Sequence, residues 1–150
     1  MVGSFFTAES RLQSKRAESA EMDLKVLPGL YAVCRLEATE AIPAWAVDGG
    51  LFSVTRTADE LSIVCEQDRV PDGIRCERDW RVLKVAGPLD FALVGILASL
   101  AGALADAGIS LFALSTFDTD YLLVQADAVE RAVAALRAAG HRVDGAEYGG

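Results

Sequence analysis

Two aspartates and a glycine at the start of an apolar stretch are the residues of this chain whose types and spacing can bind a small charged molecule. Asp90 lies just before the stretch that opens at Gly95, and Asp120 follows a polar turn further on. Carboxylates hold amino groups and cationic side chains through charge-assisted hydrogen bonds. The first N–H groups of a helix near Gly95 have no intrahelical partner and lie at the positive end of its dipole, so they suit a carboxylate. Phe117 can cover an aliphatic stem.

Each of these residues also has a simpler structural explanation. Asp90 can cap a helix, Asp118 and Asp120 can be solvated turn residues, and Ile96 and Phe117 can belong to the core. Two carboxylates also raise the possibility of general acid–base catalysis. No nucleophile or cofactor motif accompanies them in the sequence, so we expect no catalytic residues and no cofactor, and we do not expect an enzyme.

Leucines at helical spacing predict a buried helix after Gly95. The stripe is Leu93, Leu97, Leu100 and Leu104, broadened by Ile96 and several alanines. Burying each leucine contributes roughly 1.5 to 3 kcal/mol before the ordering entropy is subtracted, so the helix is a core element first. Gly108 is placed to end it.

The elements around this helix alternate in a defined order. Asp127 followed by Glu130 predicts the N-cap of a second helix, which Gly140 ends. The resulting order is βαββαβ, an α+β ferredoxin-like plan with two helices on one face of a four-stranded antiparallel sheet. The expected strands cover residues 80–86, 109–114, 121–124 and 141–146, and the link 115–120 reads as a turn.

The chain before this plan reads mostly as β structure. Segments 24–27 and 31–37 flank Pro28-Gly29 and predict a hairpin or a bulged strand. Segments 51–56 and 61–66 predict a second hairpin, and 41–47 a turn or two of helix. This half resembles a shortened version of the same plan. Trp45 and Trp80 are expected as core anchors between the two halves.

Composition limits the classes of partner. The chain has 150 residues, 52% hydrophobic content and a net charge of -8, with a mean hydropathy of +0.28 and a pI near 4.6. That is ample for a core. Nucleic-acid binding depends on a basic surface that releases counterions, and no basic stripe is present, so we expect no nucleic-acid partner.

Cysteine and histidine usage, together with hydropathy, suggests a compartment. The three cysteines, Cys34, Cys65 and Cys76, have no CxxC spacing, which fits a reduced intracellular chain. His141 is the sole histidine, so no multi-histidine metal site is expected. No apolar run is long enough for a membrane span and no signal peptide is apparent, so we expect a cytoplasmic protein without a membrane partner.

The region from Leu89 to Val124 resembles the ACT domain, a small amino-acid-sensing module, and within that family the CASTOR-type arginine sensors. The resemblance rests on three segments: Gly95-Ile96-Leu97-Ala98, Leu104-Ala105-Asp106-Ala107-Gly108-Ile109-Ser110, and Ser115 to Asp120 before Tyr121-Leu122-Leu123-Val124. The polar, charged segment 1–23 is expected to be an N-terminal tail, either flexible or a fraying helix. The resemblance implies a reduced ACT-like, β-rich unit over 24–79 and an ACT domain over 80–147.

The resemblance further implies a regulatory, allosteric role in which a free amino acid binds where two ACT units meet edge to edge. Because this chain has one full unit and one reduced unit, the site would need a homodimer, and arginine specificity does not follow. The alternative is a dimerisation or protein-interaction module that binds no ligand. The implied ligand-binding residues are Asp90, Phe91, Val94, Gly95, Ile96, Ser110, Leu111, Thr116, Phe117 and Asp120.

Overall fold

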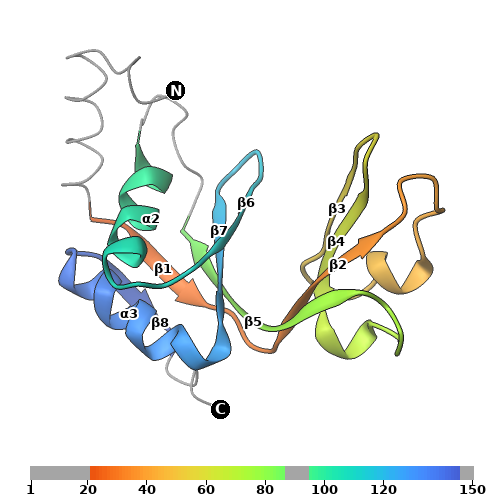
Figure 1. Ribbon diagram of the computed structural model, residues 1–150. Helices are drawn as coiled ribbons and strands as arrows, with labels where there is room; N and C mark the ends of the chain where they lie inside the picture. The colour runs from red at the N-terminus through yellow and green to blue at the C-terminus, as the bar shows by residue number, and fades with distance from the viewer. Residues whose placement is uncertain (1–20, 87–94, 146–150) are drawn as a thin grey trace.

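The computed structural model describes residues 21–86 and 95–145, which form two lobes that share strands of a single eight-stranded sheet. In Figure 1 the lobes stand apart like the arms of a V and are joined at its base by β5 and by the chain between β1 and β2. The strands are β1 (Asp23–Val26), β2 (Tyr31–Leu36), β3 (Ser53–Arg56), β4 (Leu61–Glu66), β5 (Cys76–Val85), β6 (Phe112–Ser115), β7 (Asp120–Gln125) and β8 (Arg142–Asp144). The helices are α2 (Ile96–Asp106) and α3 (Val129–Ala138), with short 3₁₀ turns η2 (Ala44–Val47), η3 (Gln67–Arg69) and η4 (Ala126–Ala128).

The C-terminal lobe confirms the predicted α+β plan. From β5 onward the order is β5, α2, β6, β7, α3, β8, and both helices lie on one side of the sheet (Figure 1). The sheet has five strands rather than the predicted four, because β1 lies between β5 and β8. β1 is antiparallel to β5 and parallel to β8. Its alternating pattern explains the insertion, since Leu24 and Val26 are buried while Asp23 and Lys25 are exposed.

Apolar stripes fix both helices to this sheet. Ile96, Leu100 and Leu104 of α2 are buried, and they share one core with β1, β5, β7 and α3. Both helices end in a Schellman motif. In α2, the N–H of Ile109 bonds the carbonyl of Leu104 at 3.0 Å and that of Gly108 bonds Ala105 at 2.9 Å.

The start of α3 differs from the prediction. Asp127 is not an N-cap, because the 3₁₀ turn η4 occupies residues 126–128 and α3 begins at Val129 without a side-chain cap. The buried stripe itself is as expected and contains Val133 and Leu136. The capping pattern at Asp127 therefore precedes the 3₁₀ turn η4, and the helix itself begins after that turn.

The N-terminal lobe is built from β2, β3, β4 and the first half of β5. The predicted β3–β4 hairpin is confirmed by the pairing of Val54 with Ile63. Of the two alternatives predicted around Pro28-Gly29, a hairpin or a bulged strand, the hairpin is wrong, because β1 and β2 do not pair. They follow one another along β5, with a register irregularity between Tyr31 and Val33. The segment turns at Pro28-Gly29 without folding back, because both strands find partners in β5.

A third hydrophobic cluster fills the space where the lobes meet. Its buried members come from both lobes: Tyr31, Val64, Val82 and Leu123. Trp80 packs there, with its ring centroid 6.4 Å from that of Phe112. Trp45 was predicted to lie between the halves as well, but it packs within the N-terminal lobe. Within the described residues no helix is long and apolar enough to cross a membrane.

His141 supports a prediction about acid stability. The ring is 5% exposed, and its Nδ1 accepts the Met22 N–H at 3.1 Å. Burial lowers the pKa of His141, against a smaller opposing effect of Glu21. The unfolded chain therefore takes up the proton first, so stability is full above about pH 6.5 and falls as the pH drops below that value. We expect denaturant melts between pH 7 and pH 5.5 to show this loss.

The matched variant is His141→Asn, whose amide oxygen can still accept the Met22 N–H. It should show a flatter stability profile over the same range, because nothing at this position then titrates. An unchanged profile would assign the acid loss to other groups.

Candidate functional site

Seven of the ten predicted ligand-binding residues lie within the described parts of the chain. They are Gly95, Ile96, Ser110, Leu111, Thr116, Phe117 and Asp120. Asp90, Phe91 and Val94 lie outside the described residues. The structure therefore bears on the helix start, the strand start and the β6–β7 turn.

The start of α2 is a helix N-terminus, where the backbone N–H groups and the helix dipole favour a negatively charged ligand group. Gly95 occupies the N-cap position with φ 85°, a left-handed conformation that glycine adopts without steric cost, and no side chain bonds to it as a cap. Its carbonyl accepts the Ser99 N–H at 2.8 Å. The Ile96 side chain is 5% exposed and packs in the core, so only its backbone can face a ligand.

The β6–β7 turn holds Asp120 in a fixed position. The Ser115 hydroxyl donates to Asp120 Oδ1 at 2.6 Å, and these two residues face each other across the hairpin. Strand alternation places Asp120 on the same face as Leu122 and Val124, which pack in the core that α2 and α3 cover. Asp120 is therefore on the helix side of the sheet.

The turn and the start of α2 lie at the same end of the C-terminal lobe (Figure 1). Within the turn, Thr116 bonds Thr119 through both its N–H, at 2.8 Å, and its hydroxyl, at 3.1 Å. Phe117 stands at the tip and is 82% exposed, so it is not a core residue. The structure thus brings Gly95 and Asp120 to one end and one face of the lobe.

Ser110 and Leu111 lie at the opposite end. They follow α2 and precede β6, whose four residues span about 13 Å. Ser110 is exposed, and Leu111 packs partly against the core below the helices. Within one chain these two residues do not meet the β6–β7 turn.

Thr119 is a positioning residue that the sequence analysis missed. It is 5% exposed, and its hydroxyl donates to the carbonyl of Val85 at the end of β5. This bond ties the turn to the strand that leads toward Gly95. The only sequence signal is a threonine inside a polar turn, and hydroxyl residues in turns commonly bond local backbone instead.

We expect Thr119→Val to cost about 1 to 3 kcal/mol of unfolding free energy, because the isosteric side chain leaves a buried carbonyl without its donor. Urea unfolding followed by circular dichroism measures the loss. Thr55→Val, at an exposed position of β3, is the control and should change stability by less than about 0.5 kcal/mol. Equal effects of the two variants would remove Thr119 from its positioning role.

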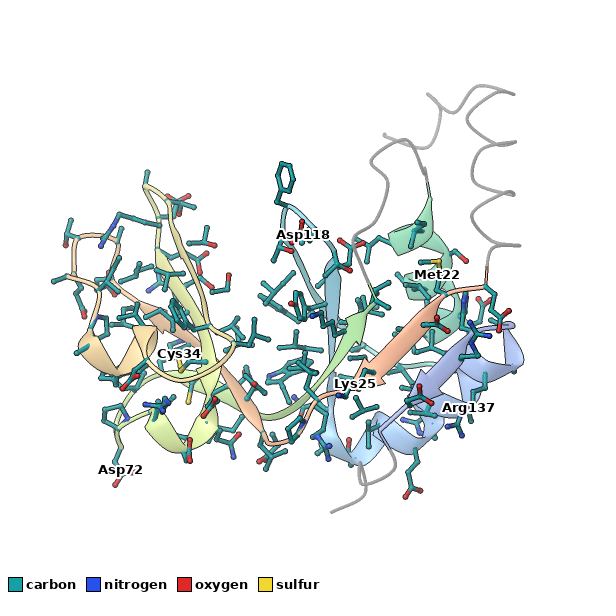
Figure 2. The ribbon with its side chains drawn as sticks, turned by 180° about the vertical axis from the view of Figure 1, so that it is seen from behind. Met22, Lys25, Cys34, Asp72, Asp118 and Arg137 are labelled. Atoms are coloured by element: carbon teal, nitrogen blue, oxygen red, sulfur yellow. The ribbon has the colours of Figure 1, made fainter. Side chains whose placement is uncertain are left out.

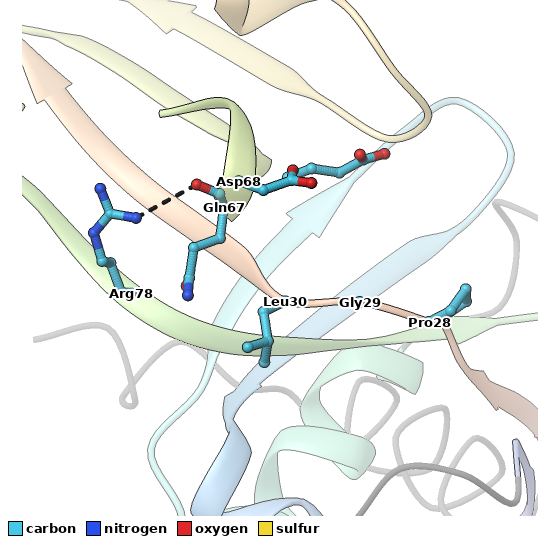
Figure 3. Close-up of a pocket in the computed structure, with 7 residues that line it drawn as sticks. Pro28, Gly29, Leu30, Gln67, Asp68 and Arg78 are labelled. Carbon is cyan, nitrogen blue, oxygen red and sulfur yellow. Dashed lines mark hydrogen bonds between the residues drawn. The ribbon is translucent and has the colours of Figure 1, made fainter. Parts of the chain in front are cut away.

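A separate pocket lies where the lobes join, away from the predicted site. It has a volume of about 690 Å³ and is shown in Figure 3. Its walls are the bend at Pro28, Gly29 and Leu30, the η3 turn with Glu66, Gln67 and Asp68, and Arg78. Arg78 donates to the carbonyl of Gln67 at 3.4 Å. The Gln67 side chain in turn accepts the N–H of Asp79, which has a φ of 70° and marks a bulge in β5. This pocket is formed by the join between the lobes.

The described residues hold no group of three or more His, Cys, Asp or Glu side chains arranged to bind a metal ion. What the predicted site offers is a pair of complementary charges: helix N–H groups near Gly95 that have no partner within the helix, and the carboxylate of Asp120. Such a pair fits a small molecule that carries both an acid and an amine.

Comparison with known proteins identifies the lobe that carries this site. The sequence model of the ACT domain matches residues 75–138. Protein Atu0741 from Agobacterium tumefaciens, whose crystal structure is known, is 45% identical, with a TM-score of 0.80, 84% of this chain and 94% of that chain covered. This chain belongs to the ACT-domain family. A second family model, that of an N-terminal domain, matches residues 29–73 of this ACT protein.

Two further relatives are more distant or shorter in their match. The human cytosolic arginine sensor for mTORC1, subunit 1, is 41% identical over 59 residues, which are 39% of this chain and 18% of that protein. The ACT protein therefore spans less than a fifth of the length of this curated relative. The aspartate kinase of Clostridium acetobutylicum shares the fold at 15% identity and a TM-score of 0.57, covering 79% of this chain and 33% of the kinase.

Proposed function

We propose that this ACT protein is a regulatory sensor that binds a free amino acid between two copies of the chain. One observation carries the proposal: the glycine-led start of α2 and the carboxylate of Asp120 lie at the same end and on the same face of the ACT lobe. The helix N–H groups receive the ligand carboxylate, and Asp120 receives its amino group or a cationic side chain.

A second copy of the chain can bring Ser110 and Leu111 to the β6–β7 turn, which they do not meet within one chain. Among the described strands β6 pairs with β7 alone, which leaves its other edge open to a strand from a partner. If the β6 edges pair about a two-fold axis, Ser110 and Leu111 of one copy approach the turn with Thr116, Phe117 and Asp120 of the other. A specific dimer of this kind would bury on the order of 1,200 to 2,000 Å².

The relatives support a sensing role and leave the ligand open. An arginine sensor shares 41% identity over 59 residues with this chain, and the fold recurs in an aspartate kinase described as allosteric. The first likeness makes arginine one candidate among the amino acids. The reduced N-terminal lobe is a departure from a chain with two full units, so a homodimer takes the place of a tandem pair.

A thermal-shift screen over the twenty amino acids tests the proposal. A ligand that binds only the folded protein stabilises it by about 2.7 kcal/mol at a concentration of 100 Kd, which raises Tm by several degrees. We expect one amino acid or a small group of related ones to do this at millimolar concentration. Sedimentation should show a dimer.

A dimer that responds to none of the twenty would favour the alternative, a module for dimerisation without a ligand. A monomer with no thermal shift would contradict both the amino-acid sensor and the ligand-free dimerisation module. Conversely, a thermal shift on a strictly monomeric chain would place the ligand within one copy.

A further inference from the structure

The three cysteines of this protein, far apart in sequence, meet in the core of the N-terminal lobe. Cys34 lies on β2, Cys65 on β4 and Cys76 at the start of β5, and all three belong to the same hydrophobic cluster. Figure 2 labels Cys34 inside this lobe. The three strands are neighbours in the sheet, in the order β4, β2, β5. Cys34 is therefore the central thiol.

The register makes Cys34 and Cys76 direct partners across two antiparallel strands. The adjacent N–H of Arg35 bonds the carbonyl of Arg75 at 3.0 Å, so the cysteines occupy the non-hydrogen-bonded type of pair. The Cα atoms of such pairs are about 4.5 Å apart, near the short end of the range of about 4.4 to 6.8 Å that disulfides span. A bond here can form, and its strain makes it readily reducible.

The thiols also influence one another's protonation, because all three lie in the same cluster. The interaction with Cys65, and then burial, raise the pKa of Cys34. The same interaction lowers the pKa of Cys65, helped by the positive charge of Arg69. The described residues offer no metal-binding group, so these thiols are arranged as pairs and not as a metal site.

Access from solvent distinguishes the three. Cys34 is 1% exposed and Cys65 is fully buried, whereas Cys76 is only partly buried. A small oxidant therefore meets Cys76 first, with Cys34 directly across the strand pair as the resolving thiol.

We propose that Cys34 and Cys76 form a reversible redox site that a peroxide converts to a cross-strand disulfide. In the first step the Cys76 sulfur attacks hydrogen peroxide and the O–O bond breaks, giving a sulfenic acid and one water. In the second the Cys34 sulfur attacks the sulfenic sulfur, and the S–O bond breaks as hydroxide takes up the Cys34 proton and leaves as a second water. The two thiols lose two electrons and two protons, and the peroxide gains them.

The disulfide would join β2 to the start of β5 within the N-terminal lobe. Cys65 lies on the other side of Cys34, on β4, and is fully buried. The site is independent of the amino-acid site in the ACT lobe.

The test uses the full chain, reduced, desalted and treated with hydrogen peroxide. Thiol titration in denaturant should fall from three groups per chain to one. Mass spectrometry of the unreduced digest should join the Cys34 and Cys76 peptides, and a thiol reductant should restore all three groups. Three remaining thiols, oxidation to sulfinic acid, or cross-links only between chains would overturn the proposal.

Two alanine variants sharpen the result. Cys65→Ala should still lose both of its thiols under peroxide, whereas Cys76→Ala should keep Cys34 free of any link to another peptide during the same exposure. Cys76 lies at the edge of the cluster, so we expect its alanine variant to fold. Circular dichroism checks this. A peptide link between Cys34 and Cys65 at the wild-type rate in Cys76→Ala would refute Cys76 as the entry point.

Discussion

Replacing Leu100 by alanine is expected to destabilise the protein by about 2 to 5 kcal/mol. Leu100 is fully buried near the middle of α2, in the core that joins both helices to the C-terminal sheet. The lost methyl groups forfeit their transfer free energy and leave a cavity that a packed core fills only in part. Domains are stable by only about 5 to 15 kcal/mol, so this single change removes a large share of the total. Tm should fall by roughly 4 to 20 °C, at about 2 to 4 °C per kcal/mol for a chain of this size.

Leu97→Ala is the matched control because it makes the same change in the same helix. Leu97 is only partly buried, so less apolar surface and a smaller cavity are involved. Urea unfolding of both variants should rank Leu100→Ala as the more damaging by at least about 1 kcal/mol. Similar losses at the two positions would mean that the stripe assigned to the core face of α2 is misplaced.

Periodicity predicted the C-terminal lobe because its elements are amphipathic in a simple way. The stripe through Leu100 and Leu104 and the one through Val133 and Leu136 both face the sheet as expected. These patterns reflect burial against a neighbouring layer, which is the dominant stabilising term. The spacing of apolar residues predicts which face of a helix is buried, even when the element that packs against that face is unknown.

Strand partners could not be predicted in the same way. The alternation of Leu24 and Val26 shows a half-buried strand but does not name its neighbour, and the turn dipeptide Pro28-Gly29 left a hairpin with 31–37 and a bulged strand both open. In the structure β1 pairs with the distant strands β5 and β8. Likewise β5 is longer than predicted, because its polar first half, with Glu77 and Asp79, pairs in the other lobe.

The glycine that begins α2 and the acid after the turn were selected from their residue types. The structure places the start of α2 and the β6–β7 turn at one end of the lobe, and ligand binding there stays a prediction. Thr119 was not found, since its bond to Val85 depends on a contact between segments far apart in sequence. Such bonds follow from topology and leave no local pattern.

Asp120→Asn is expected to weaken amino-acid binding about 10- to 150-fold, using the amino acid that gives the largest thermal shift as the probe. A hydrogen bond to a charged group is worth about 1.5 to 3 kcal/mol, and the amide keeps the shape while it removes the charge. The amide oxygen can still accept the Ser115 hydroxyl that now bonds Oδ1, so the turn should persist. Isothermal titration calorimetry measures the affinity, and sedimentation checks that the dimer is intact.

Asp118→Asn separates a direct contact from a general effect of charge. Asp118 is an exposed residue of the same turn (Figure 2) and carries the same charge. If the ligand amine meets Asp120 itself, the Asp118 variant should change the affinity by less than about 2-fold, because exposed charges at longer range are screened by salt. Equal losses in both variants, vanishing together at high salt, would show that the turn acts only through its net charge. A normal affinity in Asp120→Asn would remove Asp120 from the ligand site.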